Sequence, residues 1–454
     1  MGSHPSRTDK TRRSRGSHHR ISCSMKGMAP GATIPPKRGL GEYRTFLKQN
    51  ADFRNLWYGQ TVSLLGDWFD SVALYALILD RSTSSSALAG LVIAQLLPGA
   101  LAAPFAGVLA DRFPRKTLMI ASDLARATLV LGLLAAPLQG LLWIVYPIMI
   151  LKVVCASVFE PARNAVIPSI VKRERNVLAN TISSFTWSTM LAMGGLLGGA
   201  VFALAGYHVS ILIDAGSFLL SAWFIKKVRY QQPAHVKLHN HGPLKDLVDG
   251  FRYLARHGHV LSYAVVKFGH GFVGGTMVLY PIFAKQVFPL GRGAAVSIGL
   301  FMTARGIGTA VGPILARYFG GDSGRFLRRS IGPSMMVSSA GLLLLGAMPS
   351  MWMALAVVTL GHLGGSIAWV FSTVLLQLAS PDEFRGRVFA AELALFTLAM
   401  AVSVFITGLL EDAGWTPRQL AYLLGLTGLL PAMFFYWVMR RPSHEDEEHP
   451  ATRV

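Results

Sequence analysis

Ionisable side chains interrupt several long apolar stretches of this sequence. Asp67 and Asp70 stand about one helical turn apart, which puts both carboxylates on one face if the stretch is helical. Burial disfavours the ionised form of a carboxylate while a nearby cation favours it, so such a pair is suited to reversible proton binding. The other deep candidates for proton coupling or for lining a cavity are Arg126, Lys152, Asp214, Lys267, His270, Arg305 and His362.

Two interpretations of Asp67 and Asp70 remain open at this point. Their protonation can be coupled to a change in the surrounding cavity, so that a proton releases a bound partner. Alternatively, one of them forms a permanent salt bridge, for example to Arg126 or Lys152, that only neutralises the interior of the protein. Asp123 lies one turn before Arg126, and this spacing favours a local ion pair between the two.

The second half of the sequence carries deep cations, Lys267 and Arg305, with no comparably deep acid in the same half. We therefore predict that one of the two aspartates pairs with Lys267 or Arg305 in one state of the protein. His270, which shares a helix face with Lys267, and His362 can titrate near neutral pH. The alternative for both histidines is a packing role.

The sequence contains no phosphate-binding loop, no nucleophile–base set and no metal-ligand spacing. The two cysteines, Cys23 and Cys155, lie far apart, one in a polar stretch and one in an apolar stretch. We predict that the protein is not an enzyme, that it has no catalytic residue, metal site or cofactor, and that an ion or substrate gradient drives any energy-requiring step.

The composition indicates what kind of secondary structure carries these ionisable residues. The chain is 52% hydrophobic and 15% charged, with a mean hydropathy of +0.44, whereas soluble domains carry roughly a quarter charged residues. Apolar stretches of about 20 residues, the length of a membrane-spanning helix, recur along the chain. The sequence therefore predicts an all-α membrane protein. Twelve transmembrane helices are expected at 55–80, 86–110, 117–137, 141–160, 178–205, 209–227, 259–285, 294–318, 330–348, 351–378, 388–410 and 418–439.

A long polar break divides these helices six and six. The expected segments are a basic disordered tail (1–52), two six-helix bundles (53–228 and 258–440), a linker (229–257) and a second tail (441–454). Lysines and arginines concentrate in alternate loops, which places both termini and the linker in the cytoplasm. The net charge of +20 then reflects topology and attraction to anionic lipid, so no nucleic-acid partner is expected.

One inner loop carries a recognisable motif. Gly107-Val-Leu-Ala-Asp-Arg-Phe-Pro-Arg-Lys116 resembles the signature loop of the major facilitator superfamily, with a proline at the place of its second glycine. Gly312–Arg317 ends the eighth expected helix in a related way, as parallel repeats do. Gly195 stands where antiporters of the superfamily often carry proline. Further stretches resemble the branch of siderophore and macrolide exporters, namely 63–68, 122–126, 159–168, 214–218 and 381–388.

The resemblance implies two helical bundles that rock about a central site in the cell inner (plasma) membrane. It implies proton-driven efflux of a small molecule, such as a drug, a siderophore or another amphipathic metabolite, by a monomer. The alternatives are an importer or symporter on the same fold, and a membrane scaffold or sensor that transports nothing. The residues expected to gate the inner surface are Gly107, Asp111, Arg112, Arg115, Glu160, Arg163 and Arg385.

Overall fold

The computed structural model describes residues 40–172, 175–230, 242–321 and 323–440, and its regular structure is helical. The first half consists of α1 (Leu40–Gln49), α2 (Ala51–Arg81), α3 (Ser85–Arg112), α4 (Arg115–Gly132), α5 (Val145–Ile170) and α6 (Asn176–Lys226). The second half consists of α7 (Pro243–Arg256), α8 (Gly258–Gly271), α9 (Thr276–Gln286), α10 (Ala295–Gly320), α11 (Gly324–Ala347), α12 (Met351–Ala379), α13 (Asp382–Asp412) and α14 (Pro417–Val438). Helices pair their backbone groups internally, as a segment in lipid must.

Ten of the described helices are long and apolar enough to cross a membrane. One of them, α6, reverses direction at Gly206, whose φ of 81° is a conformation that glycine adopts readily. Both arms of α6 lie along α2. The Trp57 indole donates a 2.7 Å hydrogen bond to Thr186 of the first arm, and the backbone at Gly59 packs against Ser221 of the second. α6 therefore supplies both of the helices expected over 178–227.

The helix expected at 259–285 is interrupted between α8 and α9. The Ser403 hydroxyl of α13 donates to the carbonyl oxygen of Phe272 at 2.7 Å and accepts from the amide of Gly275 at 2.9 Å. This side chain satisfies backbone groups that the interruption frees. The expected spans appear in the predicted order, but α8 and α9 are not among the ten candidate spans, so the predicted number of twelve is not confirmed.

Several helices extend beyond their expected ends. α5 continues through Pro161 and Pro168 to Ile170, α11 begins at Gly324, and α13 begins at Asp382. Hydropathy marks only the part of a helix that lies in hydrocarbon, whereas a helix continues into water wherever its own hydrogen bonds are satisfied. The polar ends of these helices were therefore missed.

Two helices lie in stretches that were expected to be a tail and a linker. α1 occupies residues 40–49 of the expected tail, and the rest of that tail up to residue 39 lies outside the described residues, as does 441–454. α7 occupies the end of the expected linker and packs on the start of α13. Asp246 accepts a 2.8 Å hydrogen bond from Arg387, and the Tyr253 ring stacks on Phe384.

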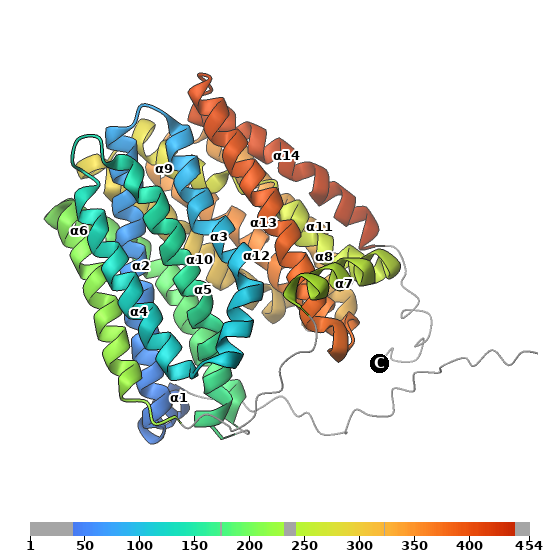
Figure 1. Ribbon diagram of the computed structural model, residues 1–454. Helices are drawn as coiled ribbons and strands as arrows, with labels where there is room; N and C mark the ends of the chain where they lie inside the picture. Colours follow the sequence, from blue (N-terminus) through green and yellow to red (C-terminus); the bar gives the residue numbers. More distant parts are fainter. Residues whose placement is uncertain (1–39, 173–174, 231–241, 322, 441–454) are drawn as a thin grey trace, which may run out of the picture.

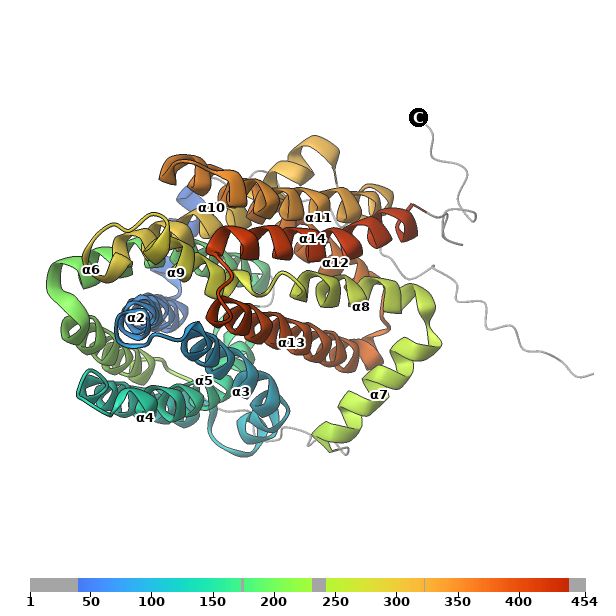
Figure 2. The same cartoon turned by 90° about the horizontal axis from the view of Figure 1, so that it is seen from above.

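The helices of the two halves lie side by side (Figures 1 and 2). The halves are joined by one apolar cluster at one end and have separate apolar clusters at the other. At the upper end in Figure 1, a single apolar cluster runs through both halves and includes Ile78, Leu91, Phe283 and Phe301. At the lower end each half has its own cluster. One surrounds Phe53, Phe159 and Ile225, and the other surrounds Val260, Phe371 and Phe435. We call the joined end the closed end and the other the open end.

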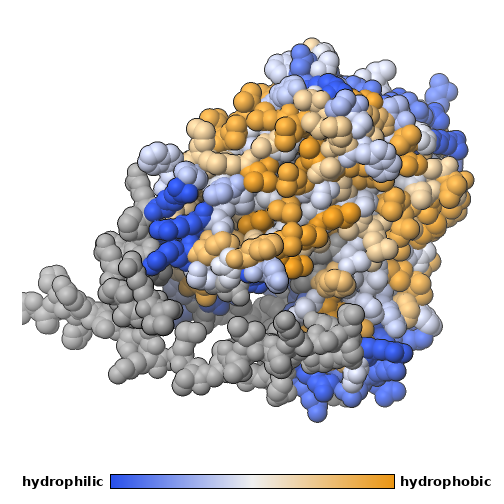
Figure 3. All heavy atoms as spheres, turned by 180° about the vertical axis from the view of Figure 1, so that it is seen from behind, coloured by the Kyte–Doolittle hydropathy of each residue, from blue (hydrophilic) through white to orange (hydrophobic). Residues whose placement is uncertain are grey.

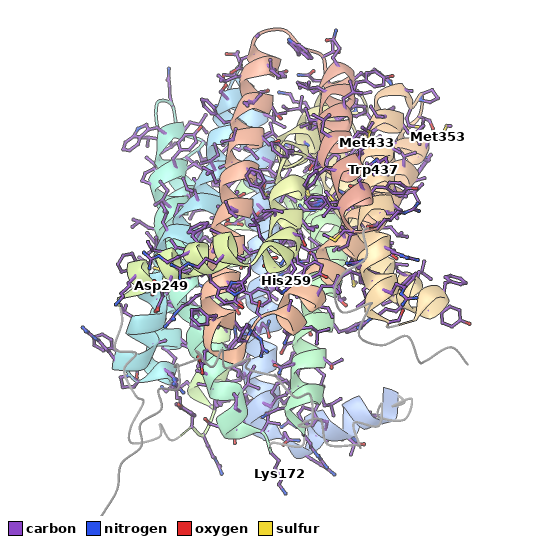
Figure 4. All side chains as sticks on the ribbon, turned by 90° about the vertical axis from the view of Figure 1, so that its right-hand side faces the viewer. Lys172, Asp249, His259, Met353, Met433 and Trp437 are labelled. Atoms are coloured by element: carbon purple, nitrogen blue, oxygen red, sulfur yellow. The ribbon has the colours of Figure 1, made fainter. Side chains whose placement is uncertain are left out.

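The outer surface suits contact with lipid. Figure 3 shows apolar side chains gathered over the body of the molecule and hydrophilic ones concentrated toward its ends. Met353, Met433 and Trp437 point outward in Figure 4, and Trp437 is 72% exposed. Large exposed apolar side chains occur on most of the long helices. Such a surface is unfavourable in water and favourable in hydrocarbon.

Glycines bring α6 and α10 together near the closed end. A Cβ atom at Gly299 would collide with the carbonyl oxygen of Gly195, and one at Gly199 would collide with that of Ala295. Small residues allow helices in lipid to approach until their backbones touch, and the resulting dispersion contacts hold them together. This contact joins the two halves.

We expect Gly299→Val to destabilise the protein by about 1–3 kcal/mol, because the added methyl groups force α6 and α10 apart. Thermal unfolding of the purified protein in detergent measures the effect. Gly216→Val is the matched control, since no atom lies within 4 Å of a Cβ built at Gly216. Equal unfolding temperatures for the two variants would contradict the assigned role of this contact.

Candidate functional site

The centre of the first half holds one lysine surrounded by three aspartates, which we call the Lys152 cluster. The ammonium group of Lys152 on α5 lies 2.8 Å from Asp67 Oδ1 and 3.0 Å from Asp214 Oδ2, and it also contacts Asp70 Oδ2. Asp70 and Asp214 are fully buried. The Asp67 side chain is 36% exposed, so it connects the cluster to the space outside.

The backbone explains how these four side chains meet. Asp67 and Asp70 project from one face of α2, as their spacing predicts. Asp214 lies on the returning arm of α6, which approaches α2 closely at Gly66. A Cβ atom at that glycine would collide with Ser217 and Asp214. The turn at Gly206 and the small residue at Gly66 thus bring the third carboxylate to the lysine.

Charge balance defines the chemistry of the Lys152 cluster. Carboxylate oxygens of the three aspartates lie within 4.8 Å of one another. Such a set can hold a hard cation, but here the ammonium group contacts all three carboxylates and supplies the positive charge. One ammonium balances one of three ionised carboxylates. A buried group with two uncompensated charges costs several kcal/mol, and proton binding removes that cost.

Asp123 and Arg126 form the local ion pair that their spacing favours, and both are buried. The Arg126 guanidinium also lies 4.3 Å from the centre of the Phe218 ring and 4.9 Å from that of Phe159. Of the two salt-bridge partners considered for Asp67 and Asp70, the structure therefore selects Lys152. Arg126 belongs to a separate pair nearby.

The second half contains a deep acid that the sequence analysis missed. Lys267 of α8 lies 3.0 Å from Glu392 Oε2 of α13, and both side chains are buried. The same ammonium lies 4.5 Å from the centre of the Trp369 ring. The expectation that this half has no deep acid was wrong, because α13 begins at Asp382 and Glu392 lies about 15 Å along it.

The pair predicted to bridge the halves is absent from this state. Among the described residues, the acids Asp67 and Asp70 bind Lys152 of their own half, and Lys267 binds Glu392 of its own half. No ion pair joins either aspartate to Arg305 in the described part of the chain. A bridge in a different state remains a prediction.

The remaining deep candidates gather around α10 and α12. Arg305 donates to the Met277 sulfur at 2.8 Å, and the Tyr280 hydroxyl lies 2.9 Å from Nε2 of His362. His270 faces the edge of the Trp369 ring, with a centroid distance of 6.4 Å. His362 thus has a hydrogen-bond partner, and His270 has a packing contact.

The predicted gating residues lie at the open end. Arg163 bonds to Gln60 and to Glu160 Oε2, the latter at 2.9 Å. Arg115 donates to the Ala165 carbonyl oxygen at 3.2 Å, and Arg385 donates to that of Ser380 at 3.3 Å. These bonds lie within one half. Arg112 is exposed, Gly107 has open space around it, and the side chain of Asp111 lies outside the described part.

Polar contacts at the closed end also escaped the sequence analysis. The Asp412 carboxylate at the end of α13 accepts hydrogen bonds from the Ser85 amide at 2.6 Å and the Ser84 hydroxyl at 2.7 Å. These groups begin α3, so an anion caps a helix N-terminus of the opposite half. Lys285 donates to the Leu79 carbonyl oxygen. The sequence signal that could have predicted this contact is a run of serines at the start of one expected helix and an acid, Asp412, at the end of another.

A helical membrane protein with two joined halves and buried ionic clusters has the architecture of a secondary transporter. The fold agrees with the solved structure of a bacterial homologue of the human lysosomal transporter Spinster in an inward-facing, unoccupied conformation. The TM-score is 0.67 at 15% identity, over 89% of this chain and 100% of that one. At this identity the likeness concerns the fold alone.

Residues 45–453 match the family model described as transmembrane secretion effector. Two relatives are the uncharacterized MFS-type transporter YfiS of Bacillus subtilis, 28% identical over 80% of this chain and 87% of its own length, and macrolide efflux protein A of Streptococcus pyogenes, 24% identical over 79% and 89%. The chain belongs to the transmembrane secretion effector family of the major facilitator superfamily. It is a multi-pass membrane transporter of small molecules, not an enzyme.

We expect Lys267→Met to destabilise the protein by about 3–5 kcal/mol, because it leaves Glu392 buried without a counter-charge. The double variant Lys267→Met, Glu392→Met should recover most of the loss, since no charge then remains buried. Thermal unfolding of the single and double variants measures both effects. Arg252→Gln breaks an exposed pair with Asp249 and should cost less than about 1 kcal/mol. A double variant no better than Lys267→Met would disprove the pairing.

Proposed function

We propose that this protein exports a small molecule in exchange for protons, which bind and leave at the Lys152 cluster. The observation that carries the proposal is the excess of carboxylates over cations in a buried position. Asp67, Asp70 and Asp214 share one ammonium, so the cluster accommodates protons that balance the remaining negative charge. Partial exposure of Asp67 provides a route for the proton.

The arrangement of the halves supports alternating access as the mechanism. The closed end is held by an apolar cluster shared by both halves, by the α6–α10 glycine contact and by the Asp412–Ser85 hydrogen bond. The halves already have separate apolar cores at the open end. Rocking one half against the other would therefore open the first end and close the second.

The basic loops lie at the open end, where α1 also lies (Figure 1). We infer that this end faces the cytoplasm, that both termini are cytoplasmic, and that the protein works as a monomer in the cell inner (plasma) membrane. The structure then corresponds to an inward-open state. In this state a proton leaves the cluster to the cytoplasm, and the substrate enters from the same side.

Export, as opposed to import, is supported by the family description and by one relative's name. The family is described as a secretion effector, and the Streptococcus pyogenes relative is named for macrolide efflux. A proton moving down a gradient of 100 mV releases about 2.3 kcal/mol, which is enough to bias a two-state equilibrium. We propose an amphipathic drug, siderophore or metabolite as the substrate.

The test uses everted membrane vesicles that contain a pH-sensitive dye. A panel of a macrolide, a siderophore and amphipathic carboxylates is added after the vesicle interior has been acidified. We expect wild-type vesicles to accumulate a compound while their interior becomes more alkaline. Asp67→Asn and Asp70→Asn should abolish the pH change, because they remove carboxylates of the Lys152 cluster.

Asp80→Asn is the matched control. Asp80 lies on the same helix, but its side chain is 68% exposed, so its loss should leave the coupling unchanged. Accumulation without any pH change would rule out proton exchange. Accumulation only after the gradient is reversed would show that the protein imports its substrate.

A further inference from the structure

Arg305 differs from the other deep cations in its partners. Arg126, Lys152, Lys267 and Arg163 each lie within 4 Å of a carboxylate. Arg305 has no carboxylate at that distance in the described part of the chain, and its hydrogen bond goes to the Met277 sulfur. A thioether is a weak acceptor, and a guanidinium carries five N–H donors. No carboxylate in the described part of the chain therefore balances the positive charge of Arg305 at close range.

Retaining an unbalanced charge at this depth is costly. A cation at the centre of a spanning helix costs about 2.5–3.5 kcal/mol on insertion scales unless it is paired or hydrated. Arg305 is partly exposed, so an incoming group can reach it. A charge that the fold leaves unpaired and reachable is suited to bind an anion that the protein carries.

The groups around Arg305 fit one end of an amphipathic molecule. Tyr75 and Tyr280 both lie within its electrostatic reach. Their hydroxyls bond to Gln95 and His362 respectively, which fixes their orientation. The Tyr280 ring stacks on Phe301, with centroids 5.8 Å apart. The Tyr75 hydroxyl gives its proton to Gln95, and the Tyr280 and Phe301 rings are buried. Arg305 itself therefore supplies the reachable positive charge of the site.

The site draws on both halves of the protein. Tyr75 belongs to α2 of the first half, whereas Arg305 and Tyr280 belong to α10 and α9 of the second. Rocking the halves would move Tyr75 relative to Arg305, so the affinity for an anion would differ between the two states. Tyr75 is also within electrostatic reach of Asp70 of the Lys152 cluster.

We propose that Arg305 binds an anionic group of the transported substrate, so that the substrate class is an amphipathic carboxylate or a similar organic anion. This inference rests on the proposed transport function but adds the charge of the substrate. Arg305 supplies the bidentate donor pair that a carboxylate prefers.

The first test compares benzoate with its neutral analogue benzamide as ligands of the purified protein. Thermal unfolding is recorded at equal ionic strength over a range of concentrations. We expect benzoate to raise the unfolding temperature of the wild type more than benzamide does. The difference should vanish in Arg305→Gln, with apparent benzoate affinity reduced about tenfold or more, as expected for a charge-assisted contact.

Arg292→Gln removes an exposed arginine near the closed end and should keep the wild-type response. Equal effects of benzoate and benzamide on the wild type, or a difference that persists in Arg305→Gln, would overturn the proposal. Neither measurement involves a proton gradient. A failure here is therefore distinguishable from a failure of proton-driven export.

The second test needs no ligand. Removing an unpaired charge from the membrane interior should raise the unfolding temperature, so Arg305→Gln should be more stable than the wild type. Lys267→Gln is the contrast, because it leaves Glu392 unpaired and should lower the unfolding temperature. If Arg305→Gln also lowers it or prevents folding, Arg305 has a structural partner and the proposal is wrong.

Discussion

A charge inside hydrocarbon must be balanced by another part of the chain or by something that the chain binds, and this constraint organises the structure. Lys152 and Lys267 satisfy it with acids from neighbouring helices of the same half. The Lys152–Asp70 and Lys267–Glu392 pairs join helices that no loop connects directly, namely α5 with α2 and α8 with α13. The deep charges therefore contribute to the packing of each bundle as well as to its chemistry.

The Lys152 cluster and Arg305 differ in how their charges are balanced. At the cluster the protein supplies more carboxylates than one ammonium balances, and at Arg305 it supplies no carboxylate in the described part of the chain. An excess of carboxylates favours the binding of protons, and an unpaired guanidinium favours the binding of an anion. Tyr75 lies within electrostatic reach of both sites. Binding at one site therefore alters the electrostatic field at the other, which is a physical basis for coupling.

The division of the apolar core is compatible with the proposed rocking of the two halves. At the closed end a common cluster joins the halves, and at the open end each half keeps its own. Each half therefore remains packed when the other moves. Glycine backbones of α6 and α10, and the Asp412 carboxylate at the N-terminus of α3, add specific contacts to this shared cluster. Such an interface can have two discrete arrangements separated by a modest free energy.

The sequence by itself determined the class of protein and the order of its helices. Hydropathy depends on the cost of exposing polar groups to lipid, and that cost is local, so the spans were visible without tertiary structure. The spacing of Asp67 and Asp70, and of Asp123 and Arg126, likewise needed only the helical period. The ends of the helices were missed where they leave the hydrocarbon, because hydropathy no longer distinguishes helix from loop there.

The tertiary structure alone decided which charges meet. Asp214 reaches Lys152 because α6 turns back at Gly206 and approaches α2 at Gly66. Glu392 became a deep acid because α13 begins well before the apolar stretch. Both outcomes depend on contacts between residues far apart in the chain, and helix periodicity does not encode those contacts. The same holds for Arg305, because only the assembled helices show that no carboxylate of the described residues lies within 4 Å of it.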